Sequence, residues 1–254
     1  MALSRTSRTA RKLAAVVGAV GVLGTASCSA GGSSVSPGEL RKYAGSEQAV
    51  QARQHAETHL RGIVQAYDKD TPLTLALVTV RDYCKTSSSG DWLSGDDTYK
   101  VRCDVAVTAY YGADPDRIGD VLDGVLAAGD RYKAAPTPRG GVALGHDDHR
   151  RKLVAYYRGH GPNPQGPDTQ EPSQISDTSQ TLNWDMVRTH QHRTLVGEPP
   201  VCVKPDPPVT RCDHEDQSTT VTDIRKKYGM VFELSLPTLE YYEVFKDGQT
   251  HTTW

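Results

Sequence analysis

The clearest pattern of apolar positions in this chain is helical and lies within residues 48–68. Apolar side chains recur there at intervals of three and four, which places them on one face of a helix. These side chains are Ala56, Leu60, Ile63, Val64 and Tyr67. Leu40 and Tyr43 extend the apolar face upstream, so the helix is expected to begin a few turns earlier. Pro72 follows the last periodic positions, so the helix is expected to end before it.

Two strands are predicted next, at residues 73–83 and 99–111. The first is rich in leucine and β-branched residues, which favour strands. The second alternates apolar odd positions with mostly polar even ones, as expected for a strand with one buried face. A disulfide between Cys84 and Cys103 would fix the register of this hairpin. The facing pairs would then be Val80 with Val107 and Val78 with Ala109, all apolar.

A second helix is predicted from Asp114 onward. Aspartate is a good N-cap, and Pro115 suits the first helical position. Apolar residues then repeat at helical spacing from Ile118, and Gly129 is a plausible C-cap. Residues 38–130 are therefore predicted to form a helix–strand–strand–helix unit of the α+β class with an antiparallel sheet.

Residues 131–254 are predicted to form a β-rich, loop-rich half. Polar, glycine-rich and proline-rich residues 159–179 indicate a mobile loop or linker. Short apolar stretches indicate strands at 153–158, 182–186 and 230–236, with 241–245 pairing back onto the last of these. The pattern leaves open whether this half is a second domain or completes the first sheet.

The N-terminus has the organisation of an export signal. Residues 1–12 are basic, residues 13–23 are apolar but too short to span a membrane, and small residues follow. Thr25-Ala26-Ser27-Cys28 resembles the lipobox of bacterial lipoprotein precursors of the actinobacterial type.

This resemblance implies that residues 1–27 are a signal peptide and that Cys28 becomes the lipidated N-terminus, carrying acyl chains such as palmitate. Two acyl chains give firm membrane anchoring. Residues 28–37 would then be the lipidated cysteine and its flexible tether. The expected location is the extracytoplasmic face of the bacterial cell membrane. The alternative is ordinary secretion, with cleavage after Ala30.

The cysteine count fits this interpretation. The chain has five cysteines, and lipidation of one of them leaves an even number for disulfides. Proximity in sequence favours the pairs Cys84–Cys103 and Cys202–Cys212. A rival interpretation is a zinc site made by Cys202, Cys212 and His214. Its spacing fits no common zinc motif, and an oxidising compartment favours the disulfide.

Charge and motifs remove several function classes. The chain has 29 basic and 31 acidic residues, which argues against a nucleic-acid-binding protein. It has no nucleophile elbow, P-loop, C-x-x-C, H-E-x-x-H or dinucleotide-binding glycine motif. The favoured hypothesis is therefore a non-catalytic binding or interaction module without a cofactor, whose partner is a cell-envelope protein or glycan.

Two other hypotheses stay open. Imidazoles and carboxylates bind zinc, so His146, His149, His190 and His192 are the candidates for a metal site or a metal-dependent hydrolase. Adjacent tyrosine pairs at 110–111, 156–157 and 241–242 would split between the two faces of a strand. One tyrosine of each pair would then be exposed and able to stack on a sugar or meet a protein.

Overall fold

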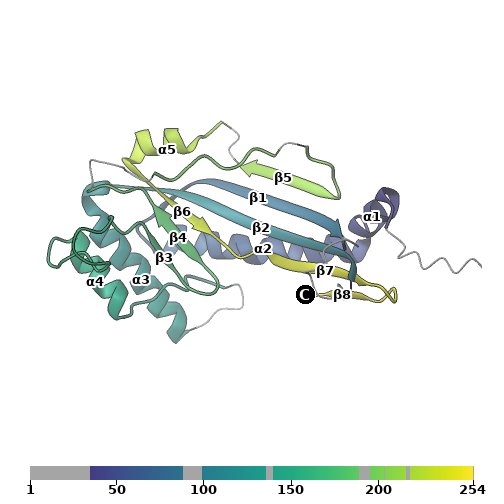
Figure 1. Ribbon diagram of the computed structural model, residues 1–254, viewed down its shortest axis with the longest axis horizontal. Coiled ribbons are helices and arrows are strands. Elements are labelled where there is room, and N and C mark those ends of the chain that lie inside the picture. Colours follow the sequence, from purple (N-terminus) through teal and green to yellow (C-terminus); the bar gives the residue numbers. More distant parts are fainter. Residues whose placement is uncertain are drawn as a thin grey trace, which may run out of the picture. The chain divides into compact units, whose positions relative to one another are not determined.

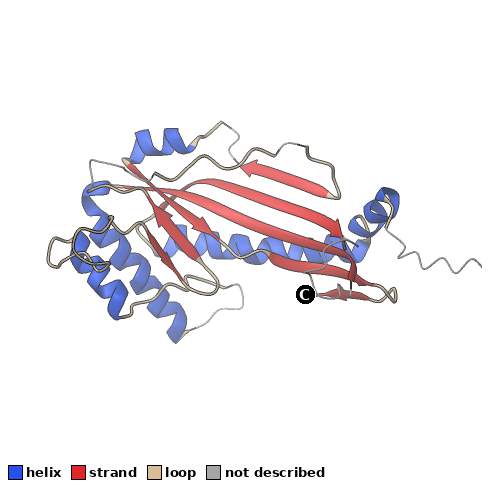
Figure 2. Ribbon diagram, in the orientation of Figure 1, coloured by secondary structure: helices blue, strands red, loops and turns tan. Residues whose placement is uncertain are grey.

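The computed structural model describes residues 35–87, 99–135, 140–188, 195–202, 204–215 and 218–253. They belong to one compact unit, Ser34–Trp254. Within the described residues, five α-helices accompany an antiparallel sheet of eight strands, so the fold is α+β as predicted (Figures 1 and 2). Strands from both halves of the chain belong to this one sheet.

The first predicted helix is two helices, α1 (Pro37–Ala44) and α2 (Glu47–Asp70). Each begins at a serine whose side chain accepts a hydrogen bond from a backbone amide of the first turn, which is the usual N-cap interaction. Helix α2 buries the predicted apolar face and lies along one face of the sheet (Figure 1). The break between the helices comes from the Ser46 cap, whose backbone is extended.

The predicted hairpin is confirmed as β1 (Thr74–Thr86) and β2 (Tyr99–Ala113). Cys84 and Cys103 face each other and form a disulfide. The register is the expected one, with Val80 opposite Val107 and Val78 opposite Ala109.

The next helix is also confirmed, but it is longer than predicted. After the 3-10 turn η1 (Pro115–Arg117), which Asp114 caps, α3 runs from Ile118 to Ala134. The predicted C-cap at Gly129 is wrong, because this glycine lies inside the helix. A Cβ atom at Gly129 would lie 2.2 Å from the backbone oxygen of Leu144, so glycine is needed there for close packing.

The strand predicted at residues 153–158 is wrong. This segment ends α4 (Asp148–Tyr157), and the side chain of Asp147 caps it by accepting from the Arg150 amide at 2.7 Å. Leu153 and Tyr157 are buried on one helix face, four residues apart. The polar run before them therefore begins a helix, and the segment LVAYY follows helical rather than alternating periodicity.

The remaining elements complete the sheet. They are β3 (Gln174–Ser176), β4 (Thr181–Trp184), β5 (Thr210–Glu215), α5 (Val221–Tyr228), β6 (Met230–Ser235), β7 (Leu239–Phe245) and β8 (Thr250–Thr252). The strand order is β3-β4-β6-β2-β1-β5, with β7 pairing β2 and β8. The expected pairing of 241–245 with 230–236 is therefore wrong. Strands β6 and β7 instead pair with successive parts of β2.

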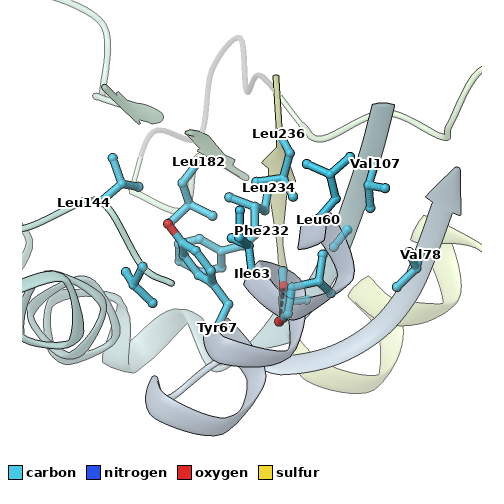
Figure 3. Packing of buried hydrophobic residues seen from close by; sticks show 14 of the residues in the cluster. Leu60, Ile63, Tyr67, Val78, Val107, Leu144, Leu182, Phe232, Leu234 and Leu236 are labelled. Carbon is cyan, nitrogen blue, oxygen red and sulfur yellow. Dashed lines mark hydrogen bonds between the residues drawn. The ribbon is translucent and has the colours of Figure 1, made fainter. Parts of the chain in front are cut away.

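The sheet buries both faces, but unequally. The face toward α2 carries the large core, in which Leu60 and Tyr67 pack against Val107, Phe232 and their neighbours (Figure 3). The opposite face is covered by a smaller cluster that includes α5. Its members are Leu77, Tyr110, Val196, Val221, Ile224 and Val231.

Candidate functional site

A pocket lies on the side of the sheet away from α2, beside this smaller cluster. Its floor comes from β1 and β5, where Thr79 faces His214 and Arg81 faces Cys212 across the ladder. Directly opposed residues of antiparallel strands share one face of the sheet. The alternation of β1 places Val78 and Val80 in the large core, so its odd-numbered neighbours lie on the pocket side.

The wall of the pocket is the segment 198–202, which has no regular secondary structure. Three contacts fix the chain around it. The buried Asp185 accepts from the Val196 amide at 2.7 Å, Glu198 accepts from the first amides of α5, and Cys202 is bonded to Cys212 of β5. A loop fixed at three points forms a wall before any ligand arrives, as is common in small-molecule sites.

The pocket has a volume of about 450 Å³, within the range of ligand pockets, which is about 300–1,000 Å³. Its lining combines apolar, hydroxyl and charged groups. The lining residues are Thr79, Val80, Arg81, Glu198, Pro199, Pro200, Val201, Cys202, Cys212, Asp213, His214, Thr220 and Thr222. Val201 is 86% exposed, an unusual exposure for a valine.

The two acidic side chains that line the pocket already interact with other residues of the protein. Glu198 accepts from the amides of Val221 and Thr222 at 2.8 and 2.9 Å. Burial raises the pKa of Glu198, but these hydrogen bonds outweigh it and leave the pKa below its ordinary value. Asp213 pairs with Arg211 at 3.2 Å. Neither carboxylate is therefore free to attract a cation into the pocket.

The two basic residues of the pocket differ from these acids, because they lack such partners among the described residues. Arg81 is exposed, and none of the described residues forms a hydrogen bond or ion pair with its side chain. His214 has a buried Nε2 atom that makes no hydrogen bond within the described part of the chain. A buried polar atom without a partner costs free energy. Of the charged side chains that line the pocket, Arg81 is thus the one whose donors are unoccupied among the described residues.

Sequence reasoning did not find this pocket. The sequence pattern offered His214 only as a zinc candidate, together with Cys202 and Cys212. The zinc interpretation is wrong, because Cys202 and Cys212 form a disulfide. The three residues do line one pocket, so their proximity was a usable signal. Arg81 gave no signal beyond its position on a strand.

The histidine hypothesis gains no support from the described residues. They contain no group of three or more His, Cys, Asp or Glu side chains that could hold a metal ion. His146 lies 2.7 Å from Asp130 and 3.1 Å from Asp123 through its two ring nitrogens, while His149 is exposed on α4. His190 and His192 lie outside the described residues, so their role stays a prediction.

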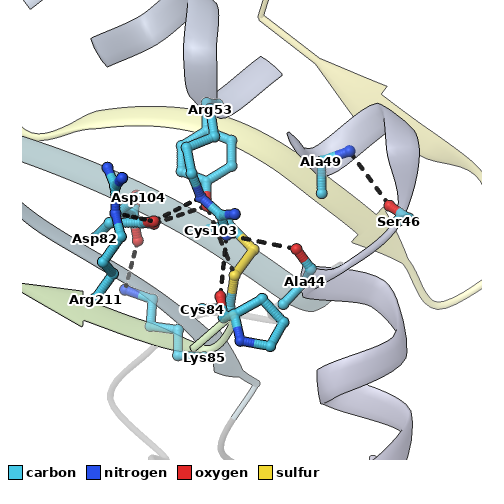
Figure 4. Close-up of a disulfide and its surroundings, with 12 residues drawn as sticks. Ala44, Ser46, Ala49, Arg53, Asp82, Cys84, Lys85, Cys103, Asp104 and Arg211 are labelled. Carbon is cyan, nitrogen blue, oxygen red and sulfur yellow. Dashed lines mark hydrogen bonds and ion pairs between the residues drawn. A yellow bond between two sulfur atoms is a disulfide. The ribbon is translucent and has the colours of Figure 1, made fainter. Parts of the chain in front are cut away.

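A second charged cluster lies on the α2 side of the sheet and has a structural role. Figure 4 shows Arg53 of α2 and Arg211 of β5 converging on Asp82, which is 1% exposed, beside the Cys84–Cys103 disulfide. Burial raises the pKa of Asp82, although the charge of Arg53 opposes this shift. The cluster fills the interface between helix and sheet rather than an open pocket.

Two of the three tyrosine pairs offer no exposed ring for the expected platform. Tyr110 and Tyr111 are both buried, one in each core, and Tyr241 and Tyr242 are both buried in the large core. The prediction of one exposed tyrosine in each pair is wrong there, because both faces of the sheet are covered at these positions. The third pair lies on α4, not on a strand.

No family model, curated protein or solved structure matches the chain. The site therefore rests on its own geometry. Both predicted disulfides are present, which indicates an oxidising, extracytoplasmic environment. None of the helices that the structure describes is long and apolar enough to cross a membrane.

Proposed function

We propose that this protein is a lipid-anchored, extracytoplasmic binding module of the bacterial cell envelope, and that the pocket over β1 and β5 is its ligand site. The observation that carries the proposal is the pocket wall, segment 198–202, which is fixed at three points beside unoccupied side chains. A preformed pocket with a few free polar groups is the usual form of a binding site.

The pocket supports binding better than catalysis. Among its described residues no hydroxyl is hydrogen-bonded to a histidine, and its two cysteines are in a disulfide. Nucleophilic catalysis needs a hydroxyl or thiol activated by a base within hydrogen-bond reach. We therefore assign the pocket to the recognition of a ligand. This ligand is a group on an envelope protein, a glycan or a free metabolite.

The binding site is tested with a diverse set of small fragments added to the exported Cys28→Ser chain, followed by ¹H–¹⁵N correlation spectra. We expect fragments to shift the amides of Thr79, His214 and Thr222. Thr79→Phe should fill the pocket and abolish these shifts, whereas Thr74→Phe on the same strand lies outside the pocket and should not. A set in which no fragment shifts the pocket amides contradicts the proposed site.

Membrane anchoring is tested separately through Cys28. We expect the wild-type chain to incorporate a labelled fatty acid and to sediment with membranes, since two acyl chains anchor firmly. Cys28→Ser should lose the label and appear in the soluble extracytoplasmic fraction. A wild-type chain that is unlabelled and released supports ordinary secretion instead, and a Cys28→Ser chain that still incorporates the labelled fatty acid contradicts lipid anchoring through this residue.

A further inference from the structure

The basic groups of the pocket differ from the other arginines that the structure describes near the sheet. Arg53 and Arg211 are occupied by Asp82, Glu57 and Asp213. Arg81 lies on the same strand as Asp82 but on its opposite face, and no described acid pairs with it. Its guanidinium therefore remains available to a molecule that enters the pocket.

We propose, on the basis of the proposed binding function, that the ligand of this pocket carries a carboxylate, which Arg81 pairs with, and a short apolar portion that packs on the proline-rich wall. The planar guanidinium fork of arginine matches the two oxygens of a carboxylate. The ligand's carboxylate would have no competing acid, because Glu198 and Asp213 are both engaged within the protein.

The rest of the pocket fits the apolar portion of such a molecule. Pro199, Pro200 and Val201 supply aliphatic surface on the wall, and the Cys202–Cys212 disulfide adds a further apolar contact. Burial of aliphatic groups against this surface contributes affinity through the hydrophobic effect. The pocket volume of about 450 Å³ accommodates a small molecule rather than a folded partner.

His214 gives the ligand a second polar contact. It faces Thr79 across the ladder, and its buried Nε2 lacks a hydrogen bond. A neutral imidazole nitrogen either donates or accepts, depending on its tautomer. A small rotation of the imidazole would expose Nε2 to a carboxylate oxygen or a ligand hydroxyl, and no described side chain competes for this atom.

The test compares two probes of equal length, hexanoate and hexanamide, titrated into the exported Cys28→Ser chain. Binding is followed through the amide shifts of Thr79, His214 and Thr222. We expect hexanoate to bind about fivefold more tightly than hexanamide, since a fivefold difference is about 1 kcal/mol, the upper value for an ion pair at an exposed side chain.

Three variants test whether Arg81 causes the preference for hexanoate. Arg81→Gln should raise the Kd of hexanoate about fivefold and leave that of hexanamide unchanged, because it removes only the charge partner. Arg81→Lys should restore part of the affinity, since lysine keeps the charge but not the fork. Arg117→Gln is the matched control, because Arg117 is another exposed arginine without a described side-chain partner and lies outside the pocket.

The outcomes separate this inference from the proposed function. Equal affinity for both probes, or hexanoate binding that Arg81→Gln does not weaken, overturns the carboxylate inference while the pocket remains a binding site. No shift from either probe also overturns the carboxylate inference. In that case the wider fragment set decides whether the pocket binds any ligand.

Discussion

The hydroxyl of Tyr241 on β7 donates a hydrogen bond of 2.8 Å to Oδ1 of Asp82 on β1. The same carboxylate lies 2.6 Å from Nε of Arg53 on α2, so two strands and the long helix meet at one buried acid. Tyr241 is fully buried, so its hydroxyl depends on partners within the protein for its hydrogen bonds.

Asp82→Ala should therefore lower the free energy of unfolding strongly. Removal of one partner of a buried ion pair leaves the other charge uncompensated, which costs about 3–5 kcal/mol. Asp148→Ala is the control, because Asp148 is 96% exposed and its pair with Arg151 lies on the surface, where such pairs contribute about 0–1 kcal/mol. Urea unfolding measures both, and equal losses would contradict a structural role for Asp82.

A surface cluster predicts a pH dependence. The hydrogen bond from His146 lowers the pKa of Asp130, so the ionised carboxylate is favoured in the folded state. Its contribution to stability is therefore present above the unfolded-state pKa of about 3.9 and is lost as the pH falls through the lower folded-state pKa.

The matching measurement compares wild type with Asp130→Asn from pH 7 to pH 3. We expect the variant to be less stable at pH 7, by no more than about 1 kcal/mol for an exposed pair. The difference should shrink below about pH 4 as the wild-type carboxylate becomes protonated. A difference that stays constant over this range argues against an electrostatic origin.

Gly129→Ala should destabilise the protein although alanine is the better helix former. The added Cβ would overlap the backbone of Leu144, and overpacking of a tight contact costs about 1–3 kcal/mol. Gly124 is a less suitable control, because a Cβ there would meet the Pro72 ring at 2.5 Å. Ala127→Gly tests the opposite change in the same helix and should cost about 1 kcal/mol through propensity alone. A stabilised Gly129→Ala variant would contradict this packing.

The two disulfides should differ in their response to a mild reductant. Cys84 and Cys103 are buried in the large core, whereas Cys202 and Cys212 are partly exposed beside the pocket. Thiol–disulfide exchange requires access of the attacking thiolate to a sulfur atom. Alkylation followed by mass spectrometry should therefore detect Cys202 and Cys212 first. Simultaneous opening of both bridges would mean that access does not control their reduction.

Much of the first half could be predicted from sequence, because its signals are local. The apolar periodicity of α2 and the alternation of β2 each lie within one element, and the Cys84–Cys103 bridge fixes the hairpin register. The second half was harder, since short elements such as α4 offer few periods to read. Leu153 and Val154 are apolar neighbours that fit a strand or a helix, and the signals for a helix are the Asp147 cap and the four-residue spacing from Leu153 to Tyr157.

The pocket could not be predicted for a different reason. Its floor and its wall come from β1, β5 and residues 198–202, which are far apart along the chain. That no described acid pairs with Arg81 is a property of the folded neighbourhood, and no spacing in the sequence records it. The predictions for Cys28, His190 and His192 concern residues outside the described part and stay predictions.

The pairing of β2 has a consequence for folding kinetics. One edge of β2 is taken by β1, its near neighbour in the chain, but the other edge is taken by β6 and β7 near the C-terminus. The long chain segment between these strands must close into a loop before they can pair, and the entropy lost in this closure slows folding. Sheets with such non-local pairing fold in milliseconds to seconds, not microseconds. Until residues 230–245 arrive, one edge of β2 stays open to other chains, and the nascent protein is at its most prone to aggregate.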